Sequence, residues 1–154
     1  MERLIENKLK EIVTKATITD VEDNHPVNVC SVMRDWIKLE NYPVVVATVF
    51  KSNIERNQFG AVIKVYYAII YVITLSDNED EVLNQNTTIR QRVEDSLRSN
   101  QRLDRLADNT DNETVYDVEI VDIDFDAQGV LDSGYLTAMS AMNLKVSTDK
   151  VGPF

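Results

Sequence analysis

Apolar residues recur at helical spacing in two segments of the chain. In residues 2–17 one apolar stripe is formed by Leu4, Ile5, Leu9, Ile12, Val13 and Ala16. In residues 79–99 a second stripe is formed by Val82, Leu83, Ile89, Val93 and Leu97. Both stripes follow a period of about 3.6 residues, so the sequence predicts an amphipathic helix in each segment. Ser76 or Asp77 is placed to cap the second helix, and a short helix near 31–38 is also compatible with the sequence.

Runs rich in β-branched and aromatic residues predict strands. They cover residues 44–50, 61–75, 115–126 and 135–148. The second run is long for one strand, but it contains Lys64 and is shorter than the ~20 apolar residues of a membrane-spanning helix. We therefore interpret it as a buried strand and expect no membrane partner.

The order of these elements predicts an α+β fold in a single domain spanning residues 1–154. The strands are expected to form a mainly antiparallel sheet, with the 79–99 helix packed across one face and an additional N-terminal helix. We expect Val82, Ile89, Val93 and Leu97 to be buried beneath that helix. Residues 149–154 show no periodicity and are expected to form a loose C-terminal tail.

Two polar segments are expected to be loops. Residues 107–114 are acidic and amide-rich, which is typical of an exposed connection. Residues 51–60 join two strands, so the sequence predicts a hairpin with an extended loop. The loop places apolar side chains among polar ones, which favours a contact with a partner protein. The candidate contact residues are Asn53, Ile54, Arg56 and Phe59. The alternative is an ordinary loop with Phe59 folded back on the core.

The charge of the chain argues against nucleic-acid binding. The net charge is −10, from 16 basic and 26 acidic residues among 154. Affinity for phosphate comes from clustered Lys and Arg, and the arginines that follow residue 89 alternate with acidic residues.

Common catalytic and cofactor-binding motifs are missing from the sequence. The chain has one histidine, His25, and one cysteine, Cys30, so one chain cannot form a two-histidine metal site, a disulfide or a cysteine zinc cluster. It has four glycines and no glycine-rich loop for phosphate. We therefore expect no catalytic residue, no cofactor and no bound metal, and we expect the protein not to be an enzyme.

The sequence D-x-D-x-D at Asp122, Asp124 and Asp126 is the densest acidic pattern in a predicted strand. Alternation along a strand puts all three carboxylates on one face. Such carboxylates could bind Ca²⁺ or Mg²⁺ or act as an acid and base pair. They point in parallel, however, and the pattern lacks the glycine and the closing glutamate of an EF-hand loop. We favour an acidic face that lines a lumen or meets a neighbouring subunit.

The helix TTIRQRVEDSLRSNQRL and the last strand SGYLTAMSAMNLKVST resemble segments of the tail-terminator and tail-completion proteins of long-tailed bacteriophages. The helix match consists of Ile89, Arg92, Val93 and Leu97, with Leu103 following. The strand match consists of Asp132, Gly134, Tyr135, Ala138, Leu144 and Val146. The resemblance covers about half the chain and is one of pattern, without an invariant motif.

This resemblance implies a virion protein whose copies form a ring, with a hexamer expected. The ring would cap the tail tube, end its polymerisation and join the tail to the head-side connector. The implied partners are further copies of the chain, the tail tube protein and the connector, while DNA passes through without being specifically bound. The first alternative is a neck protein between portal and tail. A metal-binding enzyme that uses the Asp122, Asp124 and Asp126 carboxylates, and an adaptor without a role in the virion, are more distant alternatives.

Overall fold

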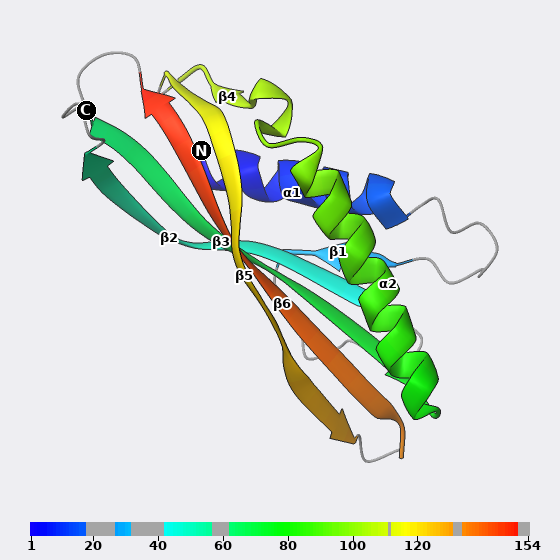
Figure 1. The fold of residues 1–154 in the computed structure, drawn as a ribbon. Coiled ribbons are helices and arrows are strands. Elements are labelled where there is room, and N and C mark those ends of the chain that lie inside the picture. The colour runs from blue at the N-terminus through cyan, green and yellow to red at the C-terminus, as the bar shows by residue number, and fades with distance from the viewer. Residues whose placement is uncertain (18–26, 32–41, 57–61, 111, 131–133, 151–154) are drawn as a thin grey trace.

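The computed structural model describes residues 1–17, 27–31, 42–56, 62–110, 112–130 and 134–150. Within them lie two α-helices, a short 3-10 turn and a six-stranded, strongly twisted sheet (Figure 1). The elements are α1 Glu2–Thr17, β1 Asn28–Cys30, β2 Val44–Arg56, β3 Val62–Ser76, α2 Glu79–Arg98, η2 Leu103–Arg105, β4 Ala107–Asp108, β5 Glu113–Val130 and β6 Leu136–Lys150. The predicted α+β fold is confirmed.

The sheet has the strand order β1-β2-β3-β6-β5-β4. Among the described strands β2, β3, β6, β5 and β4 pair antiparallel, which confirms the predicted mainly antiparallel sheet. Strand β1, which is not predicted from the sequence, pairs with β2 in parallel. Successive side chains of a strand point to opposite faces, so every second residue of β3 and β6 faces the helices.

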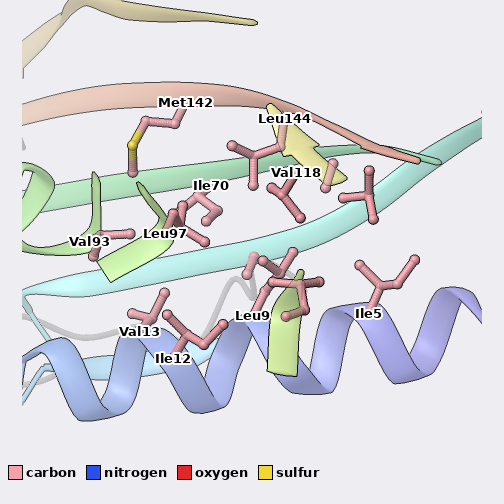
Figure 2. Close-up of a cluster of buried hydrophobic side chains, with 14 of the residues drawn as sticks. Ile5, Leu9, Ile12, Val13, Ile70, Val93, Leu97, Val118, Met142 and Leu144 are labelled. Atoms are coloured by element: carbon pink, nitrogen blue, oxygen red, sulfur yellow. The ribbon is translucent and has the colours of Figure 1, made fainter. Parts of the chain in front are cut away.

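The core is the layer between the helices and the sheet. Figure 2 shows side chains of α1, α2 and the strands meeting in this layer. The members from the central strands are Tyr66, Ala68, Ile70, Val72, Met142, Leu144 and Val146. Val82, Ile89, Val93 and Leu97 of α2 are buried, which confirms the predicted apolar face of this helix.

A buried polar residue, Asn86, fills the gap that the apolar stripe of α2 leaves between Val82 and Ile89. Its side-chain nitrogen donates hydrogen bonds to the carbonyl oxygens of Val72 in β3, at 2.9 Å, and Ala138 in β6, at 3.0 Å. Its side-chain oxygen accepts a hydrogen bond from the Ser140 hydroxyl at 2.8 Å. Because a buried amide needs its partners, this network fixes the position of α2 along the sheet.

The N-terminus of α2 is capped one residue later than the sequence predicts. The side-chain oxygen of Asn78 accepts a hydrogen bond from the Glu81 backbone N–H at 3.1 Å. Ser76 is the last residue of β3, and its hydroxyl accepts a hydrogen bond from the backbone N–H of Asn78 at 3.2 Å. The expected cap at Ser76 or Asp77 is therefore wrong.

Four predicted boundaries are also wrong. Strand β5 runs to Val130, whereas the predicted strand ends at residue 126. Strand β2 continues to Arg56, so residues 51–56 are strand and not loop, because β3 offers a pairing partner along this whole length. Ala107 and Asp108 pair with the beginning of β5, so residues 107–114 are not a free loop. Strand β6 extends to Lys150, so the predicted tail does not begin at residue 149. Three predicted segments lie outside the described residues. They are the possible helix at 31–38 (except residue 31), residues 57–61 with Phe59, and residues 151–154.

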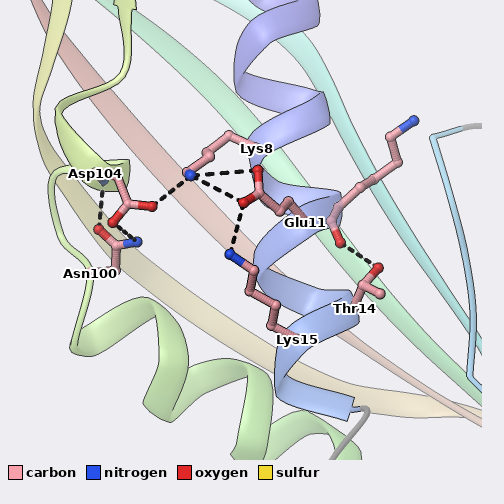
Figure 3. Close-up of polar contacts among 7 residues, drawn as sticks. Lys8, Glu11, Thr14, Lys15, Asn100 and Asp104 are labelled. Carbon is pink, nitrogen blue, oxygen red and sulfur yellow. Dashed lines mark hydrogen bonds and ion pairs between the residues drawn. The ribbon is translucent and has the colours of Figure 1, made fainter.

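An ion pair connects α1 to the turn that follows α2 (Figure 3). The Lys8 ammonium contacts the carboxylate of Asp104, and Asn100 and Asp104 exchange hydrogen bonds of 2.8 and 3.0 Å. The hydrogen bond from Lys8 holds the pKa of Asp104 below its ordinary value. Leu103, Asp104 and Arg105 have φ angles of 48°, 57° and 57°, a left-handed conformation that is costly for residues other than glycine. The buried Leu103 side chain and the polar contacts of Asp104 hold this turn.

We predict that Leu97→Ala lowers the free energy of unfolding by ~2–5 kcal/mol, because it leaves a cavity in the buried layer. Urea unfolding measures the change. Leu83→Ala is the matched control, since Leu83 lies on the same helix but is only half-buried, and its loss should be smaller. A loss at Leu97 below ~0.5 kcal/mol, the range of surface substitutions, would contradict the described core.

Candidate functional site

The sheet face opposite to α1 and α2, which we call the outer face, changes character from β3 to β5. On β3 it carries Ile63, Val65, Tyr67, Ile69, Tyr71, Ile73 and Leu75, since these residues alternate with the core residues of the strand. Val65 and Ile73 are buried, whereas the other five side chains are half-buried. On β5 the same face is acidic.

The acidic row on the outer face consists of Asp117, Glu119, Asp122 and Asp124 of β5. Each pairs with a β6 residue that points away from the helices, namely Ser147, Lys145, Asn143 and Ala141. Strict alternation would separate the first two carboxylates from the last two. A register shift between Ile120 and Asp122 restores the phase, so all four carboxylates share one face.

The prediction for Asp122 and Asp124 is therefore correct in placing them together, and both side chains are exposed. Asp126 lies within a further register shift, between Asp124 and Ala127, and its side chain is outside the described ones. Asn143 donates a hydrogen bond to Asp122 at 2.5 Å. Asp117 and Glu119 also belong to the row. Their place in it is not predicted from the sequence, because no local sequence pattern indicates the bulge between Ile120 and Asp122.

The main cation beside the row is already paired. The Lys145 ammonium lies 3.3 Å from the Glu55 carboxylate of β2, and the Tyr67 hydroxyl donates to the same carboxylate at 3.1 Å. The hydrogen bond to Glu55 is the largest cause that raises the pKa of Lys145 above its ordinary value, and Glu119 adds a smaller contribution. Lys145 therefore contacts Glu55, while Glu119 acts on it only as a nearby charge.

The geometry of the row does not favour a metal ion. Within the described part of the chain no group of three or more His, Cys, Asp or Glu side chains is placed to hold one. Asp122 and Asp124 lie two residues apart along a strand, about 7 Å, and point the same way, so their carboxylates do not converge.

The candidate partner-contact residues lie on a strand. Ile54 is 64% exposed and Arg56 is exposed, while Asn53 is half-buried on the outer face. The idea of an apolar contact residue at Ile54 is compatible with this exposure, but the element that carries it is the border of the sheet.

Both long borders of the sheet are open among the described residues. Strand β1 pairs only with residues 44–46 of β2, and β4 pairs only with residues 113–114 of β5. We call residues 47–56 the β2 border and residues 115–125 the β5 border. On each border one backbone N–H is already bonded. The Glu6 carboxylate of α1 accepts a hydrogen bond from the Val49 N–H at 3.0 Å, and the Leu106 carbonyl accepts one from the Val115 N–H at 2.8 Å.

Each register shift of the two border strands presents a large apolar side chain. The shifts lie between Val49 and Lys51 of β2, and at three places in β5. The residues at these shifts that are large, apolar and exposed are Phe50, Tyr116, Val121 and Phe125. Phe125 has the Arg90 guanidinium of α2 over its ring, at 4.2 Å from the centroid. In the sequence, each of these bulges corresponds to an apolar residue that breaks the alternation of the strand. This can be recognised only once the strand pairing is known.

No known protein family matches this chain, and no characterised protein sequence is significantly similar to it. In the described residues we also find no helix with the length and apolar character needed to cross a bilayer.

We predict that replacing Asp122, Asp124 and Asp126 together by Asn leaves the fold intact, with an unchanged or slightly higher thermal midpoint. The reason is that neighbouring carboxylates repel one another. Thermal unfolding and calorimetric titration with Ca²⁺ and Mg²⁺ provide the test. If the wild type binds Ca²⁺ or Mg²⁺ with micromolar affinity and the triple variant does not, the three carboxylates form a metal site, and our interpretation of them as an acidic face is wrong.

Proposed function

We propose that this protein is a non-enzymatic virion protein of a long-tailed bacteriophage. In this proposal its copies form a ring, most simply of six, at the head-side end of the tail tube. The ring ends polymerisation of the tube and joins the tail to the connector.

The acidic row of β5 is the observation that carries the proposal. Strand β5 contains no Lys, Arg or His, and its described carboxylates at 117, 119, 122 and 124 share one face. An acidic wall repels the phosphates of DNA, so a lumen lined in this way lets DNA pass without holding it. The net charge of the whole chain, −10, is also negative and adds to this repulsion.

The open borders of the sheet support a ring. A ring with cyclic symmetry needs two different patches on each subunit, which meet head to tail. The β2 border and the β5 border are such a pair, because they lie on opposite sides of one sheet and differ in sequence.

We predict that deleting the gene from the phage that carries it gives heads without joined tails, together with tubes that are overlong or uncapped. Electron microscopy of the lysate measures tube length and joining, and expression of the wild-type gene in the host is the control that restores both. Joined tails of normal length would contradict tail termination. Unjoined tails of normal length would instead favour a neck protein.

A further inference from the structure

We infer that neighbouring copies of this chain meet through the β2 border of one copy and the β5 border of the next. This contact would be the subunit interface of the proposed ring, so the inference rests on the proposed function. The structure supports it by exposure, bulge geometry and charge.

The exposed large apolar side chains of the described residues gather on the two borders. Phe50 and Ile54 of β2 are 59% and 64% exposed. Tyr116, Val121 and Phe125 of β5 are 41%, 53% and 59% exposed. The others are Leu4 on α1 and Tyr135, at 38% and 37%. Apolar side chains grouped along a strand border are typical of a surface that a partner covers.

The bulges explain why these borders do not pair with any strand they meet. A bulge twists a border strand and interrupts its row of hydrogen-bonding groups, which protects it against unselective sheet extension. A polar side chain at each bulge would protect the border equally well. Apolar side chains at Phe50 and Val121 add stability where a matching surface removes them from water.

The charges of the two borders are complementary. The β2 border carries Lys51 and Arg56, and its one carboxylate, Glu55, already contacts Lys145. The β5 border carries only acidic charges. Contact between unlike borders brings opposite charges together, which favours this pairing and its register.

A second copy of the same chain is the partner that fits best, because both matching borders belong to one sheet. A symmetric contact of two β5 borders would place carboxylates against carboxylates and is disfavoured. A symmetric contact of two β2 borders would gather Lys51 and Arg56 of both copies at one seam and is disfavoured for the same reason. The remaining arrangement is head to tail, which leaves one border open on each end of every incomplete assembly.

Two variants, each with one damaged border, test this arrangement. Phe50→Asp damages the β2 border and Val121→Asp damages the β5 border. Sedimentation equilibrium at up to about 1 mM protein detects contacts as weak as a millimolar Kd. The wild type should associate, and each variant alone should associate at least about tenfold more weakly, since a buried apolar anchor contributes strongly to an interface.

The mixture of the two variants gives the decisive result. Each variant retains the border that the other has lost, so an equimolar mixture should form a 1:1 dimer and nothing larger. Leu4→Asp is the matched control, because it adds the same charge at an exposed apolar residue that belongs to neither border strand, and it should associate like the wild type. Ile54→Asp is a second β2-border variant that should pair with Val121→Asp in the same way. Unchanged unfolding midpoints establish that the variants are folded.

The contact is wrong if the wild type stays monomeric at about 1 mM, where even weak contacts are populated. It is also wrong if one variant alone dimerises as the wild type does, or if the mixture forms no dimer. These outcomes differ from a failure of the proposed function. A 1:1 dimer together with normal tails in the deletion strain would keep the contact and reject tail termination, whereas variants that associate normally would reject the contact alone.

Discussion

The side chain of Asn86 holds α2 on the sheet, and the other surfaces of the molecule depend on this position. Its amide connects the helix to carbonyl groups of two adjacent strands, β3 and β6. Leaving such a buried amide without partners costs about 1–3 kcal/mol, so the helix cannot slide by a turn without losing these bonds. With α2 in this register, its apolar stripe covers the centre of one sheet face, and Arg90 reaches Phe125 at the border.

Among the described residues the helices cover one sheet face, which leaves the outer face and most of both long borders for further contacts. Four bulges shape these surfaces, one in β2 and three in β5. In β5 the register shift that leaves Val121 exposed also brings the carboxylates of Asp117 and Asp122 onto one face. One structural feature therefore accounts for both an exposed apolar residue on the border and an acidic row, the two features on which the proposed ring depends.

Local periodicity predicts much of this fold, and non-local pairing accounts for the rest. The stripe ending at Leu97 is visible in the sequence because helix packing repeats every 3.6 residues. Residues 51–56 look like a loop because their strand character comes from pairing with β3. The left-handed turn at Asp104 depends on Lys8, which is distant in sequence. In the candidate site, Asp122 and Asp124 are recognisable by their spacing, whereas Asp117 joins them only through a bulge.

The most direct test of the account is electron cryomicroscopy of the neck region in the intact phage. We predict a ring of this chain on the head-side end of the tail tube, with the β2 border of each copy against the β5 border of the next. The carboxylates of Asp122 and Asp124 should face the channel that holds the DNA. The absence of the chain from the virion, or a ring whose subunits meet through α1 and α2 with the acidic row turned outward, would contradict the account.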